Sequence, residues 1–185
     1  MGAGERGEAA VNQTTLERTS DSEIVIRRTF NGPPRIVFDA WTRPALVERW
    51  WAPASRGVTV VSCQADVREG GAWRYVLHHQ AHGELPFSGT YREVTPPSRL
   101  VYTEIFEPGR TAPDESAHAV VTVTFDERDG KTDVTSRSRF PSKAVLEMVL
   151  ATGMEAGLRE TMDQLDALVA SLDVPVAPGA TGAST

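Results

Sequence analysis

The sequence predicts an α+β domain in which a curved, seven-stranded antiparallel sheet wraps around one long C-terminal helix. Two observations carry this prediction. Six stretches between residues 58 and 140 alternate apolar with polar side chains and are joined by short connections. The stretch 142–172 instead repeats its apolar residues every three or four positions. Consecutive strands with short connections pair antiparallel, and one face of their sheet must pack against the helix.

The domain is expected to cover residues 23–172. Residues 1–22 and 173–185 are mostly small or polar, so we expect them to form disordered tails. The first strand is predicted where apolar residues alternate from Ile24 to Phe30.

Two short helices are expected after the first strand. Residues 35–41 carry apolar side chains at helical spacing, and Pro44 suits the first turn of a second helix that ends near Trp50. Six more strands follow. They are predicted over 58–67, 72–79, 87–94, 100–106, 118–125 and 132–140. Between the last two, Asp129-Gly130 is a typical hairpin turn.

The last helix is predicted from Ser142, which can cap it, to Leu172. It contains Gly153 and Gly157, each of which should cost about 1 kcal/mol relative to alanine in a helix interior. Residues four apart lie on one side of a helix. Either the sheet packs very close to this side, or the side leaves room for a ligand.

Aromatic residues on the predicted strands are candidates for a binding site. Trp73 and Tyr75 share one strand face, and a pocket lined by such rings suits a small molecule as well as an ordinary core does. Of the adjacent Trp50 and Trp51, one should be core and the other could cover a cavity mouth. The candidate ligand-binding residues are Trp51, Trp73, Tyr75, Tyr91, Tyr102, Met148, Thr152, Gly153 and Gly157.

No nucleophile or phosphate-binding motif is present. If a reaction occurs, Glu104 and Tyr102 are the candidate catalytic residues, with Arg74 or Arg92 as further charged groups. The alternative is that these charges face solvent. The run 78–82 contains three histidines, but neighbouring strand residues point to opposite faces. We interpret it as a solvated hairpin tip and expect no metal and no cofactor.

Composition restricts the partners. The chain of 185 residues has a net charge of −6 and no cluster of Lys and Arg, which argues against nucleic acid and membrane as partners. Cys63 is the only cysteine, so there is no intrachain disulfide. No apolar run suits a secretory signal or a membrane span, and we expect a cytoplasmic protein.

Five strings resemble the SRPBCC superfamily, the START and birch-pollen-allergen-like helix-grip proteins. More narrowly, they are similar to the branch named after the C-terminal domain of the activator of heat-shock protein 90 ATPase. The strings are RTFNGPPRIVFDAWTRPALVERWWAP, DVREGGAWRY, FSGTYREVTPPSRLVYT, HAVVTVTF and TGMEAGLRETMDQLDALV. The resemblance implies the helix-grip fold over residues 23–172. It implies no single function, because the superfamily includes cyclases, lipid carriers, toxin-resistance proteins and co-chaperones.

We therefore expect a small apolar or aromatic molecule, lipid- or polyketide-like, to bind between sheet and helix. One alternative is a cyclase- or hydrolase-type enzyme that uses the same cavity. Another is a co-chaperone-like interaction module. It ranks last because the activators that name the branch carry a further N-terminal domain, whereas about 22 residues precede the fold here. The largely apolar stretch 144–154 suits either a pocket wall or a homodimer contact.

Overall fold

The computed structural model describes residues 13–107 and 118–173. Its strands are β1 (Thr15–Ser20), β2 (Glu23–Phe30), β3 (Val58–Ala65), β4 (Ala72–His79), β5 (Gly83–Thr95), β6 (Arg99–Phe106), β7 (Ala119–Arg128) and β8 (Lys131–Arg139). Its helices are α1 (Pro34–Thr42), α2 (Pro44–Val47), the 3-10 helix η1 (Ala54–Arg56), α3 (Lys143–Ala151) and α4 (Met154–Leu172).

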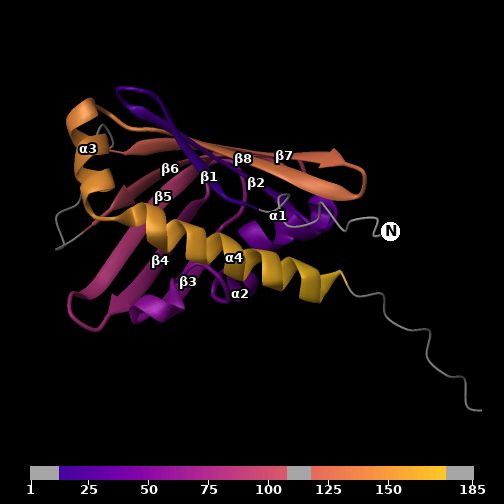
Figure 1. The fold of residues 1–185 in the computed structure, drawn as a ribbon, viewed down its shortest axis with the longest axis horizontal. Helices are drawn as coiled ribbons and strands as arrows, with labels where there is room; N and C mark the ends of the chain where they lie inside the picture. The colour runs from indigo at the N-terminus through magenta and orange to yellow at the C-terminus, as the bar shows by residue number, and fades with distance from the viewer. Residues whose placement is uncertain (1–12, 108–117, 174–185) are drawn as a thin grey trace, which may run out of the picture.

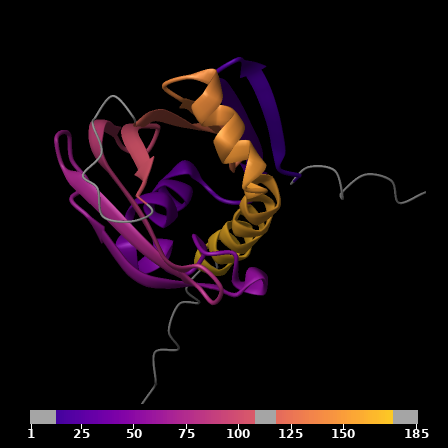
Figure 2. The same cartoon turned by 90° about the vertical axis from the view of Figure 1, so that its left-hand side faces the viewer.

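All strands join one antiparallel sheet in the order β1-β2-β8-β7-β6-β5-β4-β3. Helix α4 crosses the sheet (Figure 1), and the end view shows the sheet curling while α3 and α4 close its open side (Figure 2). The α+β prediction of a curved sheet around a C-terminal helix is confirmed. The Asp129-Gly130 turn is confirmed as well, since both residues have positive φ, 52° and 75°.

The sheet has eight strands where the sequence predicted seven. The additional strand, β1, lies inside the segment 1–22 that composition assigned to a disordered tail, and it pairs antiparallel with β2. Of its six residues only Leu16 is partly buried. An edge strand of this kind is held by backbone hydrogen bonds and shows no apolar alternation, so periodicity cannot reveal it. Residues 1–12 and 174–185 lie outside the described part of the chain.

The predicted single helix over 142–172 is wrong, because it is two helices. Ser142 does cap the first, accepting a hydrogen bond from Val145 N at 3.3 Å. Helix α3 ends at Ala151, and Gly153 adopts a left-handed conformation with φ of 74° before α4 begins. Glycine tolerates this conformation without the steric cost of a Cβ atom. The glycine therefore turns the chain between two helices instead of weakening one.

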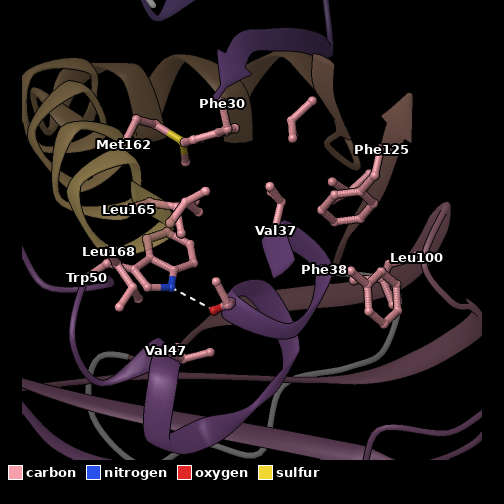
Figure 3. Packing of buried hydrophobic residues seen from close by; sticks show 14 of the residues in the cluster. Phe30, Val37, Phe38, Val47, Trp50, Leu100, Phe125, Met162, Leu165 and Leu168 are labelled. Carbon is pink, nitrogen blue, oxygen red and sulfur yellow. Dashed lines mark hydrogen bonds between the residues drawn. The ribbon is translucent and has the colours of Figure 1, made fainter. Parts of the chain in front are cut away.

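The main core lies between α4, α1 and the sheet. Figure 3 shows Phe30, Val37, Leu165 and neighbouring side chains packed together. Phe30, Val37, Leu100, Leu165 and Val169 are completely buried. Apolar residues of α4 recur every three or four positions, so one stripe of this helix faces the sheet. This stripe is the part of the C-terminal pattern that the sequence predicts correctly.

A charged contact also joins α4 to the sheet. Arg28 of β2 is 7% exposed and its guanidinium lies 2.5 Å from Asp163 and 3.2 Å from Asp166 of α4. A buried cation needs such partners, because desolvation disfavours an isolated charge. In the part of the chain that is described, no helix combines the length and the apolar content that crossing a bilayer requires.

Candidate ligand-binding site

Aromatic side chains from five segments converge beside the main core. We call the space they enclose the ring pocket. It is lined by Trp41, Trp50, Trp51, Trp73, Tyr75, Tyr91, Leu100, Tyr102 and Glu104. The unfilled volume is about 20 Å³, which is room for about one water molecule. The rings thus nearly fill the pocket themselves.

Trp73 of β4 is held in the pocket by a hydrogen bond that crosses a strand. Its indole N–H donates to the carbonyl of Thr103 on β6 at 3.2 Å. The strand between them, β5, carries Gly89 opposite Trp73. A Cβ atom at Gly89 would lie 1.7 Å from Thr103 O and 2.7 Å from Trp73 Nε1. Only glycine leaves space for this bond, so Gly89 positions Trp73 without itself lining the pocket.

Tyr75 and Tyr102 contact the ring of Trp73, and Tyr91 contacts Tyr102 edge-on. The ring of Trp73 lies 4.9 Å from Tyr75 and 5.7 Å from Tyr102, measured between centroids. The Tyr75 hydroxyl donates a hydrogen bond to that of Tyr91, and the Trp41 N–H donates to the Tyr102 hydroxyl. Burial raises the pKa of all three phenols. They therefore stay protonated at neutral pH.

The adjacent tryptophans have different environments. Trp50 is 2% exposed, and its indole N–H donates to Ala40 O at 2.8 Å (Figure 3). Trp51 is partly exposed and contacts Tyr75 and Phe87 edge-on, at centroid distances of 5.1 and 4.9 Å. Gln164 of α4 donates to the carbonyls of Trp50 and Ala52, both at 2.8 Å. The backbone around Trp51 is therefore anchored, while its ring reaches the pocket from the solvent side.

Glu104 is the one carboxylate that lines the ring pocket. It lies on the same strand face of β6 as Leu100 and Tyr102, and desolvation by its surroundings raises the pKa of its carboxyl to about 7. Within residues 13–107 and 118–173, no side chain donates a hydrogen bond to it or forms an ion pair with it. The other charged candidates, Arg74 and Arg92, are exposed, and Arg74 lies 3.5 Å from Glu107.

Five of the nine predicted ligand-binding residues line the pocket, namely Trp51, Trp73, Tyr75, Tyr91 and Tyr102. The other four do not. Thr152, Gly153 and Met148 are exposed, and 66% of the Met148 surface is accessible. A Cβ atom at Gly157 would contact Pro53 at 3.6 Å. Gly157 therefore faces the segment before η1 at ordinary contact distance, and it marks neither a very close sheet nor space for a ligand. The homodimer suggested by the apolar stretch stays a prediction.

The histidine run covers the end of β4 and the turn that leads to β5, so it lies at the tip of a hairpin as predicted. The rings of His79 and His82 lie 4.5 Å apart. Among the described residues, no group of three or more His, Cys, Asp or Glu side chains is arranged to hold a metal ion. Cys63 is buried, and this desolvation raises the pKa of its thiol to about 12, so the thiolate is not formed at neutral pH.

Comparison with known families decides the classification. A model of the family described as "Activator of Hsp90 ATPase homolog 1-like protein" matches residues 31–170. The chain belongs to this family. Membership confirms the SRPBCC resemblance of the sequence, and with it the helix-grip fold, which is a known scaffold for ligand binding. No functionally curated protein matches the chain.

Solved structures of bacterial proteins share the fold of this family member. A protein from Rhodobacter sphaeroides has a TM-score of 0.76 at 23% identity, covering 87% of this chain and 100% of that one. One from Staphylococcus epidermidis has a TM-score of 0.69 at 27% identity, covering 90% and 99%. One from Arthrobacter aurescens has a TM-score of 0.74 at 22% identity, covering 85% and 91%. These likenesses show the common architecture.

The sequence does not identify three residues of the site, Trp41, Gly89 and Gln164. Trp41 is predicted only as part of a short helix, Gln164 carries no local signal, and Gly89 carries only the general one of a glycine within a strand. Their roles depend on partners on distant elements, Tyr102 for Trp41, Thr103 for Gly89 and the Trp50 carbonyl for Gln164. A glycine inside a strand is a general sign of close backbone approach, and this was the available hint for Gly89.

Proposed function

We propose that the protein binds a small apolar or aromatic molecule in the ring pocket, with Trp51 as the movable cover. The observation that carries the proposal is the convergence of seven aromatic lining residues on one small space. Hydrophobic cores are filled mainly by aliphatic side chains, whereas ligand sites combine aromatic walls with a few polar groups. Family membership supports the proposal, because the shared fold is a ligand-binding scaffold.

The pocket must enlarge to admit a ligand. At about 20 Å³ it holds a water molecule and nothing larger. Trp51 is the lining indole that is partly exposed and that has no hydrogen bond from its N–H group within the described residues. Rotation of this side chain would open the pocket without breaking a polar contact.

Thermal denaturation with a panel of aromatic, lipid and polyketide-like compounds tests the proposal. A ligand of the folded state should raise Tm in a saturable manner. Trp51→Ala should alter the affinity, and it should let free indole bind in the place of the removed ring. Val61→Ala is the matched control, because Val61 is 56% exposed and lies outside the pocket lining. Absence of binding by the wild type, together with absence of indole binding by Trp51→Ala, would refute the proposal.

A second candidate function is acid-base catalysis on a molecule in the same pocket. The observation that favours it is Glu104, whose carboxyl pKa is raised to about 7. A carboxyl of this kind exchanges its proton near neutral pH, as a general acid or base must. If a compound that binds is also converted, Glu104→Gln should abolish turnover while binding and folding persist. Unchanged turnover in this variant would exclude the catalytic role.

A further inference from the structure

Three of the four indole N–H groups that line the ring pocket are already used within the protein. The N–H groups of Trp41, Trp50 and Trp73 bond to Tyr102, Ala40 and Thr103. The Tyr75 hydroxyl donates to that of Tyr91. A ligand entering the pocket therefore meets mainly ring faces, and the donors left to it are the Trp51 N–H and two phenol hydroxyls. An anionic group such as a carboxylate or phosphate would exchange its hydration for these few donors and would lie beside the Glu104 carboxyl.

The charge of the pocket also has one sign. Glu104 is an acidic lining residue, and no Lys, Arg or His lines the pocket among the residues that the structure describes. The charged candidates Arg74 of β4 and Arg92 of β5 are exposed. The other titratable lining groups are the three tyrosines, which burial keeps neutral. Glu104 thus has no cationic partner within the pocket.

Aromatic faces carry a negative quadrupole and attract cations, most strongly when water is excluded. A carboxylate beside several such faces adds a full negative charge. An alkylated ammonium group needs no hydrogen-bond acceptor in a fixed direction and presents methyl groups to the rings. An alkylated ammonium group is therefore complementary to the negative ring faces and the carboxylate, and it brings the positive charge that the pocket lacks.

We infer that the ring pocket takes an organic cation, in the form of an alkylammonium group on an apolar or aromatic body, with Glu104 as its counter-ion. The inference rests on the proposed binding function and narrows the class of ligand. The cation would occupy the space between Trp51, Trp73 and Glu104 after the Trp51 ring has turned outward. It would provide the opposite charge that the protein itself does not supply there.

Matched ligands distinguish the contribution of the ligand's charge to affinity from that of its shape. Benzyltrimethylammonium is the probe, and neopentylbenzene is its neutral isostere, in which carbon replaces nitrogen. Phenylacetate adds the opposite charge on a related ring. Isothermal titration calorimetry should give an affinity at least about tenfold higher for the ammonium than for the isostere, from the combined attraction of ring faces and carboxylate. Phenylacetate should bind least.

Variants of two glutamates complete the test. Glu104→Gln keeps the size of the side chain and removes its charge, so it should reduce the preference for the ammonium to about twofold or less. Glu84→Gln, on exposed Glu84 of β5 outside the lining, should keep the full preference. Circular dichroism confirms that both variants fold.

The outcomes distinguish failure of the cation inference from failure of the proposed binding function. If the isostere binds as tightly as the ammonium in the wild type, the pocket binds ligands but the cation inference is wrong. The inference is also wrong if Glu104→Gln keeps the preference. If none of the probes binds, and Trp51→Ala fails to bind indole, the proposed function and the inference fall together.

Discussion

The interior of this protein has two neighbouring regions that the same sheet encloses. Under α4, the main core is largely aliphatic, and Leu165 and Val169 are completely buried. In the ring pocket, most lining residues carry an O–H or N–H group, and Glu104 contributes an ionisable carboxyl. The core needs only close packing, whereas each polar group in the pocket needs a partner. This contrast supports the proposal that the pocket, unlike the core, binds a ligand.

The largest expected contrast lies between adjacent lining residues, because Trp50 is buried where the pocket meets the core and Trp51 is partly exposed at the pocket edge. Trp50→Ala should lower the free energy of unfolding by about 3–5 kcal/mol, since it leaves a large cavity and an unpaired Ala40 carbonyl. Trp51→Ala should cost about 1–2 kcal/mol, because its ring is partly exposed. Urea denaturation measures both. Equal losses would remove the distinction between the two regions.

Gly89 tests whether the pocket wall depends on close strand approach. Gly89→Ala should destabilise the protein by about 3 kcal/mol, because the new methyl group meets Thr103 O and must displace β5 or the Trp73 indole. Near-ultraviolet circular dichroism should report the altered Trp73 environment. Gly157→Ala is the control, since the same methyl group there makes only an ordinary contact. An unperturbed spectrum in Gly89→Ala would contradict this account.

The pocket, which contains Glu104, should make the free energy of unfolding depend on pH, whereas the aliphatic core should not. The folded-state pKa of Glu104 is about 7 and lies above the ordinary value of 4.5. The folded state therefore binds more protons between these values, and stability falls as pH rises from 4.5 to 7. Glu104→Gln removes this loss, so at pH 8 the variant should be more stable than the wild type by about 2 kcal/mol.

The Glu104→Gln difference should vanish below pH 4.5, where the carboxyl is protonated in both states. Urea denaturation of wild type and variant at a series of pH values measures it. The same comparison of wild type with Glu84→Gln, a change at an exposed glutamate, gives the baseline for the stability difference. A difference that stays constant with pH would show that the Glu104 carboxyl is not desolvated.

The smallest effects concern the two glycines of the C-terminal segment. Gly153→Ala should destabilise by about 1 kcal/mol, because alanine disfavours its φ of 74° even though no atom lies near. Gly157→Ala should stabilise by up to about 1 kcal/mol, because alanine is the better helix former. Thermal denaturation should show Tm shifts of opposite sign. Shifts of the same sign would refute the helix break at Gly153.

Much of the fold could be predicted from the sequence because periodicity is local. Alternation along β4 and β8, and the three-to-four spacing of Met162, Leu165 and Val169, express which side chains face the interior. Edge strand β1 lacked this signal because nearly all its side chains are exposed. The break at Gly153 was missed because an apolar pattern continued on both sides of it.

The candidate site was predictable only in part. Aromatic strand residues such as Trp73 and Tyr102 could be selected by type, and they do line the pocket. Met148 and Thr152 lie on the single helix that the sequence predicts, and the structure places both at the surface. Trp41 and Gln164 could not be found, since their partners lie far away in the chain.

The sequence by itself determined seven of the eight strands in the described part of the chain, the helical stretches, their order and the antiparallel pairing, because neighbouring residues encode these properties. The tertiary structure alone decided which rings meet, that the Trp73 indole reaches Thr103 across Gly89, and that Glu104 stays without a cationic partner in the pocket. The physical reason is that burial and hydrogen-bond pairing depend on distances between residues from different elements. No local pattern contains those distances.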